Sequence, residues 1–250
     1  MNNKKVAIIT GSGRGIGAAT AKLFASNGYA VCVNYKSNAS AANAVAEEIQ
    51  VSGGTCIAIQ ADVSQEDDVN RLFDTVDHQL GVVSVLVNNA GILRQQMRLE
   101  DMSADRINAI LTNNVTGYFL CCREAVKRMS TRHGGVGGVI VNVSSGAART
   151  GSPNEYIDYA ASKGAIDTLT KGLSVEVAAE NIRVNCVRPG LIHTDMHADG
   201  GEPERVERLK SKIPMQRGGE PIEVAEAIYW LASDQSSFAT GNFLDLTGGL

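Results

Sequence analysis

Two side chains that could move a proton stand four residues apart in the second half of the sequence, Tyr159 and Lys163 in the segment YAASK. The segment predicts a helix, on which residues four apart share a face. A free tyrosine has a pKa of about 10, and a nearby ammonium group favours the tyrosinate and lowers that pKa. Such a pair could take a proton from an alcohol or return one to a carbonyl. The same spacing is common on solvated helices, so the pair alone does not establish a site. Tyr156 has Ala160 four residues on and lacks the ammonium.

Near the start of the chain, the stretch IITGSGRGIGAAT has a glycine at every second position from Gly11 to Gly17. Crowded glycines of this kind let a backbone lie against a phosphate. Gly13, Gly15 and Ala18 satisfy the spacing G-x-G-x-x-G/A of dinucleotide-binding turns. Gly11, Gly15 and Gly17 satisfy a second spacing, G-x-x-x-G-x-G.

The elements that must position these residues follow from short apolar runs that alternate with longer helical patterns. The runs predict strands over residues 6–10, 30–34, 56–60, 83–88, 139–143, 183–187 and 243–246. The patterns between them predict helices that include 39–51, 66–79, 104–132 and 157–179. Apolar strands separated by helical crossovers indicate a doubly wound α/β fold, a parallel sheet covered on both faces. No linker or repeat interrupts the pattern, so we expect residues 1–250 to form one domain.

This architecture favours one of the two glycine spacings. The first strand should end near Thr10, so Gly11 occupies the tight turn directly after it. Gly15 then lets the backbone approach a pyrophosphate, and Gly17 lets the following helix pack closely on the strand. The spacing that begins at Gly13 leaves two extra residues in a turn that is normally short.

Composition excludes several classes of function. The formal charge of −4 and the pI of about 5.6 do not suit an electrostatic nucleic-acid binder. No apolar run approaches the roughly 20 residues that span a bilayer. The five cysteines show no metal-ligand spacing, and reduced thiols in a cytoplasmic protein are the expected state. His193 and His197 stand four apart without an evident third ligand, so we expect no metal site.

Five motifs agree in order and spacing with one family. They are TGSGRGIG at residues 10–17, VNNAG at 87–91, NVSS at 142–145, YAASK at 159–163 and VRPGLIHT at 187–194. Together they resemble the signature set of the short-chain dehydrogenase/reductase family over essentially the whole chain. The resemblance is to bacterial members similar to glucose 1-dehydrogenase or 3-oxoacyl-carrier-protein reductase. It implies a single Rossmann-type sheet of seven parallel strands.

The resemblance also implies the catalytic residues. Tyr159 is the acid/base, tuned by Lys163 together with the positive ring of an oxidised nicotinamide. Ser145 holds the substrate oxygen, although it precedes Tyr159 by 14 residues rather than the family's more usual 13, so Ser144 stays open as an alternative. Asn114 in NNVTG matches the helix-borne asparagine that supports a proton-relay water, with Asn113 beside it.

The family's cofactor site carries over residue by residue. The positions expected to contact an NAD(P) cofactor are Gly11, Ser12, Arg14, Gly15, Ile16, Gly17, Asn34, Tyr35, Lys36, Asp62, Val63, Asn89, Ala90, Gly91, Tyr159, Lys163, Pro189, Gly190, Ile192 and Thr194. Among these, Asp62 and Val63 match adenine contacts, and the four positions from Pro189 to Thr194 match residues that flank the nicotinamide and its carboxamide. Residues 195–214 correspond to the family's variable substrate lid, and the charge run EPERVERLK within them also fits a solvated amphipathic helix.

Cofactor choice depends on the end of the second strand, which reads VCVNYKSN. NAD enzymes of this fold place an acidic residue there, which repels a 2′-phosphate. Tyr35 fills that position here, and Arg14 and Lys36 could reach the same corner. We therefore expect a preference for NADP(H), with NAD(H) possible.

The expected function is interconversion of a secondary alcohol or sugar hydroxyl with a carbonyl, by hydride transfer. The alternatives are a 3-oxoacyl-carrier-protein reductase-like enzyme and a non-catalytic NADP(H)-binding scaffold or sensor. The family usually forms tetramers through its two long helices and its last strand, and we expect a homotetramer, with apolar candidates on those helices at Ile107, Leu111, Val115, Phe119, Leu169, Leu173 and Val177. The expected partner is a small-molecule substrate, with neither nucleic acid nor membrane.

Overall fold

A sheet of seven parallel strands runs through the computed structural model, which describes residues 4–250. The strands are β1 (Val6–Ile9), β2 (Ala30–Tyr35), β3 (Thr55–Gln60), β4 (Val83–Asn88), β5 (Gly138–Val143), β6 (Ile182–Pro189) and β7 (Phe243–Leu246). Their order across the sheet is β3-β2-β1-β4-β5-β6-β7. The chain therefore winds outward from β1 in two directions, and the order reverses between β1 and β4, where ligands bind in sheets of this kind. The predicted doubly wound α/β fold is confirmed.

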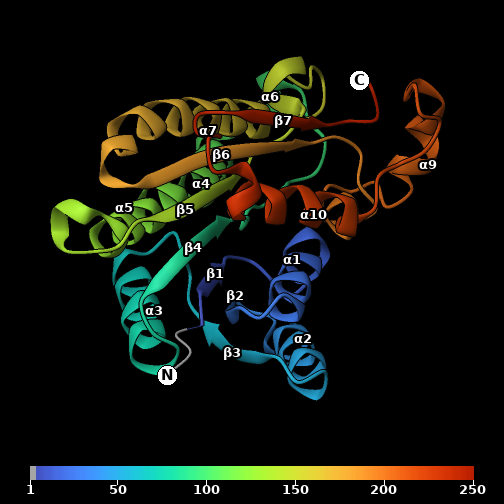
Figure 1. Cartoon of the computed structure of the whole chain (residues 1–250). Helices are drawn as coiled ribbons and strands as arrows, with labels where there is room; N and C mark the ends of the chain where they lie inside the picture. The colour runs from blue at the N-terminus through green and yellow to red at the C-terminus, as the bar shows by residue number, and fades with distance from the viewer. Residues whose placement is uncertain (1–3) are drawn as a thin grey trace.

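Helices cover both faces of the sheet (Figure 1). They are α1 (Gly15–Ser26), α2 (Ala39–Val51), α3 (Glu66–Gln79), α4 (Ala104–Leu111), α5 (Gly117–Met129), α6 (Ala147–Thr150), α7 (Ile157–Glu176), α8 (Met196–Asp199), α9 (Arg205–Leu209) and α10 (Pro221–Ala232). One apolar cluster joins the sheet to α1, α2 and α10, and a second joins the opposite face to α3, α5 and α7. Two faces that both need covering explain why the strands are apolar at nearly every position.

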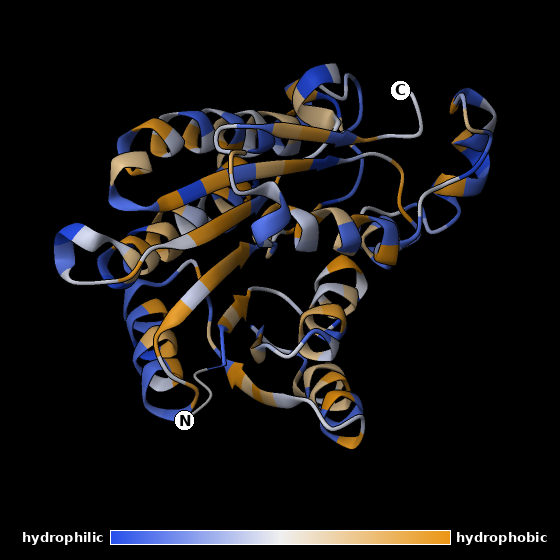
Figure 2. Cartoon of the chain, viewed as in Figure 1, coloured by the Kyte–Doolittle hydropathy of each residue, from blue (hydrophilic) through white to orange (hydrophobic). Residues whose placement is uncertain are grey.

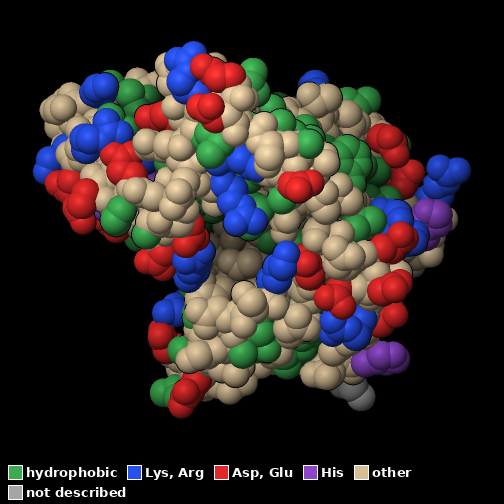
Figure 3. All heavy atoms as spheres, turned by 180° about the vertical axis from the view of Figure 1, so that it is seen from behind, with side chains coloured by type: hydrophobic (Ala, Val, Ile, Leu, Met, Phe, Trp, Pro, Cys, Tyr) green, Lys and Arg blue, Asp and Glu red, His purple; other side chains and the backbone are tan. Residues whose placement is uncertain are grey.

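Hydropathy follows this layering. Figure 2 shows hydrophobic residues along the strands and hydrophilic residues on the outward sides of the helices. On the face seen in Figure 3, lysine and arginine side chains lie among aspartate and glutamate side chains rather than in one large basic field. That distribution agrees with the small net charge of −4.

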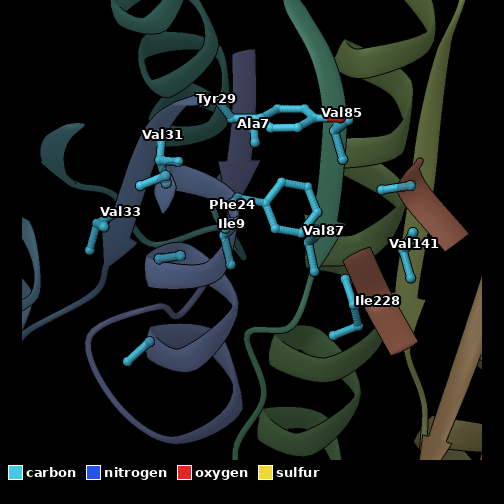
Figure 4. Packing of buried hydrophobic residues seen from close by; sticks show 14 of the residues in the cluster. Ala7, Ile9, Phe24, Tyr29, Val31, Val33, Val85, Val87, Val141 and Ile228 are labelled. Atoms are coloured by element: carbon cyan, nitrogen blue, oxygen red, sulfur yellow. The ribbon is translucent and has the colours of Figure 1, made fainter. Parts of the chain in front are cut away.

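Aromatic rings anchor α1 in the first of the two clusters. The Phe24 ring on α1 lies 5.0 Å from the Tyr29 ring and 5.3 Å from the Tyr229 ring of α10, both in edge-to-face geometry. In Figure 4, Phe24 packs against the strand residues Ile9 and Val87 near Ile228. Phe24 is fully buried, so this packing fixes the helix that follows the glycine-rich turn.

The expected helices over 39–51 and 66–79 have the same bounds as α2 and α3. The helix expected over 104–132 is present as α4, a π-helical turn η2 (Thr112–Thr116) and α5 in direct succession, with right-handed helical dihedrals at both junctions, but it ends at Met129. The helix expected over 157–179 ends at Glu176, and β1 ends at Ile9. Within the lid, the charge run EPERVERLK contains the short helix α9, in which Val206 is buried, and α8 and the 3-10 turn η5 (Lys210–Lys212) lie on either side of it.

Candidate active site

Helix α7 carries Tyr159 and Lys163 past the end of β5. The Lys163 ammonium is 3% exposed and donates hydrogen bonds to the Val143 carbonyl at 2.8 Å and to the Tyr118 hydroxyl at 3.2 Å. Its Nζ lies 5.6 Å from the centre of the Tyr159 ring. Tyr118, on α5, gives no sequence signal, yet it fixes the lysine.

The two serines at the end of β5 have different surroundings. Ser144 is buried and donates to the Lys163 carbonyl at 3.1 Å, so its hydroxyl supports the helix backbone. Ser145 is half-buried, accepts from the Ala147 amide at 3.1 Å and lines the same cavity as Tyr159, where its hydroxyl acts to lower the pKa of the phenol. The Ser144 hydroxyl is thus bound to the backbone of α7, whereas the Ser145 hydroxyl acts on Tyr159.

Burial dominates the proton affinities of this group. It raises the pKa of Tyr159 to about 12, although the Ser145 hydrogen bond acts in the opposite direction. Burial also lowers the pKa of Lys163 to about 8. In the protein alone burial therefore outweighs any lowering of the tyrosine pKa. The lowering expected from the lysine together with the positive nicotinamide ring stays a prediction for the protein with cofactor bound.

Asn114 lies in the π-helical turn η2 and is fully buried. Its side-chain oxygen accepts from the Ile92 amide at 2.8 Å, and its amide group donates to the Ile92 carbonyl at 3.0 Å and to Ser162 at 3.2 Å. A Cβ added at Gly91 would lie 3.5 Å from that oxygen and 3.7 Å from the Lys163 ammonium. Asn114 thus ties the loop after β4 to α7, close to the lysine. Asn113 instead accepts from Lys36 at 3.1 Å.

The glycine-rich turn has the geometry of the spacing that begins at Gly11. Gly11 and Gly15 have φ of +62° and +54°, which disfavours any side chain there. A Cβ at Gly11 would lie 2.8 Å from the Ala90 Cα, and one at Gly17 would lie 2.7 Å from the Gly11 oxygen. A Cβ at Gly13 would meet nothing closer than 3.4 Å. The turn and the start of α1 therefore form an open backbone cradle that fits a phosphate.

Two adjoining cavities meet at this edge of the sheet. The first, here the Tyr159 cavity, has a volume of about 490 Å³, and the second, the glycine-turn cavity, about 450 Å³. Of the expected site residues, the Tyr159 cavity is lined by Ile16, Asn89, Ser145, Tyr159, Lys163, Pro189, Gly190, Ile192 and Thr194. The glycine-turn cavity is lined by Gly11, Arg14, Gly15, Ile16, Asn34, Tyr35, Lys36, Asp62, Val63, Asn89, Ala90, Gly91 and Thr194. Ile16, Asn89 and Thr194 line both, so one extended ligand could occupy the two cavities together.

Two expected cofactor contacts, Ser12 and Asn34, also shape the turn, and of these only Asn34 lines the glycine-turn cavity. Ser12 is fully buried, donates from its hydroxyl to the Ile9 carbonyl at 2.7 Å and accepts from the Asn34 amide at 3.1 Å. The Asn34 side chain accepts from the Gly11 amide at 3.2 Å and donates to the Ala61 carbonyl at 3.1 Å. Ser12 is therefore not available to a ligand, and Asn34 fixes the end of β2 to the glycine-rich turn.

Both expected phosphate-reading cations are paired with carboxylates. The Lys36 ammonium lies 2.8 Å from Asp62, and the Arg14 guanidinium forms an ion pair with Asp199 of α8. Burial opposes ionisation of Asp62, but hydrogen bonds from Lys36 and Ser64 outweigh it and lower the pKa of that carboxyl. More than half of each cationic side chain stays exposed. Each cation thus lines the glycine-turn cavity while paired with a carboxylate, of which Asp199 is 44% exposed and Asp62 is 20% exposed.

The lid is held to the loop that precedes α7. The Arg205 guanidinium forms an ion pair with Glu155, lies 3.0 Å from Glu202 and stands 5.2 Å from the centre of the Tyr156 ring. The Tyr156 hydroxyl donates to the Gly200 carbonyl at 3.1 Å. Tyr156, which lacks the lysine, thus supports the lid, and Arg205 lay in what the sequence indicated only as a charge run.

Among residues 4–250, no group of three His, Cys, Asp or Glu side chains could hold a metal ion. The His197 Nε2 atom pairs with the Ile192 carbonyl at 2.9 Å, and His193 lies 3.9 Å from Glu220. No helix in the same residues has the length and apolar character needed to cross a membrane.

Known proteins with similar sequences and structures agree with this geometry. The family whose sequence pattern matches residues 11–250 is described as enoyl-(acyl carrier protein) reductase. The chain is 61% identical over 244 residues to a protein named uncharacterized oxidoreductase YgfF of Escherichia coli, covering 98% of this chain and 99% of that protein. It is 38% identical over 247 residues to 3beta-hydroxysteroid dehydrogenase 1 of Eggerthella lenta, covering 98% and 93%.

The two relatives that the sequence motifs suggested are also present among the matches. Glucose 1-dehydrogenase 2 of Bacillus subtilis is 36% identical, covering 98% of this chain and 94% of that protein. A 3-oxoacyl-[acyl-carrier-protein] reductase of Synechocystis is 38% identical, covering 98% and 96%. A crystal structure of a short-chain type dehydrogenase/reductase from Mycobacterium marinum superposes with a TM-score of 0.91 at 35% identity, covering 98% of this chain and 94% of that chain. The chain therefore belongs to the short-chain dehydrogenase/reductase family of oxidoreductases, whose members use a nicotinamide cofactor.

Proposed function

We propose that the enzyme interconverts a secondary alcohol and a carbonyl in the Tyr159 cavity, with Tyr159 as the general acid and base. The observation that carries this proposal is that Ser145, Tyr159 and Lys163 line one cavity, with the Lys163 ammonium 5.6 Å from the centre of the Tyr159 ring, next to the glycine-rich cradle. A nicotinamide bound there supplies the chemistry of hydride transfer. Ser145 holds the substrate oxygen beside the tyrosine hydroxyl, and the proton moves between that oxygen and Tyr159.

The raised pKa of Tyr159 suits one half of this reaction directly. With a pKa of about 12, the phenol keeps its proton at neutral pH and is ready to donate it to a carbonyl oxygen. The reverse direction needs the tyrosinate, which a positive charge close to the ring favours. Lys163 supplies one such charge, and Asn114 keeps the loop after β4 against α7 so that the lysine stays in place.

The experiment that tests this function is a panel of sugars, polyols, steroids and β-keto thioesters. Absorbance of the reduced nicotinamide reports turnover of each compound in either direction. Turnover of at least one class, abolished in Tyr159→Phe, is the expected result. Tight nicotinamide binding without turnover of any class would favour a scaffold or sensor. Turnover confined to the thioesters would favour the 3-oxoacyl-carrier-protein reductase alternative.

For the cofactor, we propose a preference for NADP(H), with NAD(H) accepted more weakly. Tyr35 stands at the end of β2, where an NAD enzyme carries a carboxylate, and Arg14 and Lys36 line the same cavity. A 2′-phosphate would compete with Asp199 for Arg14 and with Asp62 for Lys36. Because both cations are more than half exposed, each should contribute about 1 kcal/mol, or about fivefold in selectivity.

The ratio of kcat/KM for NADP to that for NAD tests this preference. Lys36→Ala and Arg14→Ala should each lower the ratio about fivefold. Tyr35→Asp should lower it further by adding a repulsive carboxylate. Lys22→Ala is the matched control, because Lys22 pairs with Glu48 on the outer side of α1 and α2 and does not line the glycine-turn cavity. A wild-type preference for NAD, or ratios that none of the variants changes, would contradict the proposal.

We propose further that the enzyme is a homotetramer. The support is exposed apolar side chains on the two long helical segments of one face. Leu111 ends α4 at 40% exposure, Phe119 on α5 is 51% exposed and Val175 on α7 is 70% exposed. Symmetric, self-complementary contacts between copies would cover them. Val177, which the sequence also suggested for this role, is 1% exposed and belongs to the core.

The proposed compartment is the cytoplasm, and the proposed organisation is one domain with a lid over residues 195–214. All five cysteines are buried and unpaired, which suits a reducing compartment. A single sheet takes strands from residue 6 to residue 246, and both apolar clusters pack against it, which supports one domain. The lid contacts the Tyr159 cavity through Met196, His197, Arg205 and Leu209.

A further inference from the structure

Apolar side chains form most of the wall of the Tyr159 cavity beyond the Ser145–Tyr159 pair. They come from the loop after β4, from β5, from the loop after β6 and from the lid. The residues are Leu93, Val143, Ala147, Leu191, Met196 and Leu209. Apolar walls gain free energy from burying apolar ligand surface and offer nothing to an ion.

Among the described residues that line this cavity there is no aspartate or glutamate, and each of the two arginines is paired with a carboxylate that lies outside it. Arg149, on α6, has a side chain that is 58% exposed and donates to Asp245 of β7 at 2.7 Å, a carboxylate that Arg188 also approaches at 3.6 Å. Arg149 lines the cavity and Asp245 does not, so a ligand in the cavity would meet the arginine and not its carboxylate partner.

Arg205 is held still more completely. Its side chain is 11% exposed, and its guanidinium meets Glu155 on one side and Glu202 on the other. Its remaining face covers the Tyr156 ring. A ligand carboxylate would have to displace one of these carboxylates to reach a donor.

The other titratable groups of the wall carry no free charge toward the body of a ligand. Burial lowers the pKa of His197, so the ring is neutral at pH 7, with its Nε2 atom paired to the Ile192 carbonyl. Tyr156 donates to Gly200. Lys163 donates to Val143 and Tyr118 at the end of the cavity where the tyrosine lies.

We propose that the Tyr159 cavity takes an uncharged alcohol or ketone with an apolar body, and rejects the same body when it carries a carboxylate or a phosphate. This inference rests on the proposed function of the same cavity and names the class of its substrate. The selecting residues are Asp245, Glu155 and Glu202, which act through the arginines that they neutralise. Rejection follows because a ligand anion would lose its water without gaining an unpaired cation.

A matched pair of ketones tests the proposal. One is a cyclohexanone with a methyl ester at the far ring carbon, and the other is the same ketone with a free carboxylate there. Both are reduced at neutral pH with NADPH, and kcat/KM is compared in the wild type, Asp245→Asn and Asp234→Asn. Asp245→Asn removes the carboxylate partner of Arg149, whereas Asp234→Asn removes the same charge from a pair with Lys5 that lines neither cavity.

We expect the wild type to prefer the ester by at least about tenfold in kcat/KM. Asp245→Asn should raise kcat/KM for the carboxylate by about fivefold and leave that for the ester within about twofold, and Asp234→Asn should change neither. Equal or better turnover of the carboxylate by the wild type would overturn the proposal. No gain for the carboxylate in Asp245→Asn would also overturn it, because the arginine would not then be what the carboxylate lacks.

Ligand binding separates this inference from the proposed function. The thermal shift that each ketone produces in the NADP-loaded protein needs no turnover. A larger shift with the ester than with the carboxylate, in the absence of reduction, would support the selectivity and contradict the proposed chemistry. Equal shifts would contradict the selectivity alone.

Discussion

Replacing Tyr159 with phenylalanine removes one oxygen atom and leaves the ring. The Ser145 hydroxyl lines the same cavity and acts to lower the pKa of the phenol, while the ring lies next to the Lys163 ammonium. The packing of α7 and the position of the lysine should therefore survive the change. The perturbation is confined to the atom that would carry the transferred proton.

The expected loss of kcat follows from the contribution of general acid–base catalysis to the rate. A positioned general acid or base contributes about 10²- to 10⁴-fold, which is about 3 to 5 kcal/mol of activation free energy. The matched control is Tyr156→Phe, because Tyr156 lines the same cavity and its hydroxyl donates to the Gly200 carbonyl at 3.1 Å. Loss of that hydrogen bond should loosen the lid by about 1 kcal/mol and raise KM about fivefold, with kcat nearly unchanged.

The assay is steady-state kinetics with the best substrate of the panel, together with the NADP dissociation constant measured by fluorescence titration. Tyr159→Phe should lose at least about a hundredfold in kcat and keep its NADP affinity. If the two variants lose activity to a similar extent, Tyr159 is not the acid and base, and the lysine beside it has another purpose. A large fall in NADP affinity in Tyr159→Phe would likewise refute the reasoning, since the cofactor would then depend on the missing hydroxyl.

Three further predictions concern charge, packing and assembly. Because the pKa of Lys163 falls from 10.5 unfolded to about 8 folded, the unfolded state binds the extra proton between those values, and stability rises with pH across that window. Relative to Lys163→Met, the wild type should gain about 2 to 3 kcal/mol of unfolding free energy between pH 8 and pH 10 in denaturant titrations; a constant difference would mean that the lysine titrates normally. Asp158→Ala should cost about 3 to 5 kcal/mol in the same titrations, because it leaves Arg106 without its buried partner at 2.8 Å; a loss below about 1 kcal/mol would show that the pair is solvated. Light scattering at micromolar concentration should report four copies, and Phe119→Asp should shift the protein to smaller species, whereas a wild-type monomer would reject the assembly.

The sequence predicted the sheet and most helices because their signals are local. The bounds of α2 and α3 were predicted because their apolar residues recur at helical spacing. Those residues are the ones that pack against the two faces of the sheet. The glycine register followed from the position of one strand end, and the positive φ of Gly11 and Gly15 agrees with it. Residue spacing therefore predicts helices and turns well, because these depend on the conformation of the local backbone.

The sequence pattern did not predict the features that depend on contacts between segments far apart in the chain. Nothing local in NNVTG indicates a π-helical turn, which depends on the contacts of Asn114 with Ile92 and Ser162. The raised pKa of Tyr159 could not be foreseen either, because it depends on burial and on which acceptors surround Lys163. The pairing of Arg205 with Glu155 joins residues 50 apart, and only the fold brings them together.

Strand β1 lies between β2 and β4 in the sheet, so its pairing in a nascent chain is complete only after β4 has been made. β1, β2 and β3 are complete by Gln60, but the other edge of β1 stays open until β4 ends at Asn88. Asn89 then donates from its side chain to the Thr10 carbonyl at 2.9 Å and to the Gly11 carbonyl at 3.1 Å, which closes the glycine-rich turn. A ribosome-bound chain shorter than this exposes an apolar strand edge on which other chains can pair. We therefore expect a nucleotide to bind only after β4 has paired with β1, so that its binding would stabilise newly made chains once they have folded.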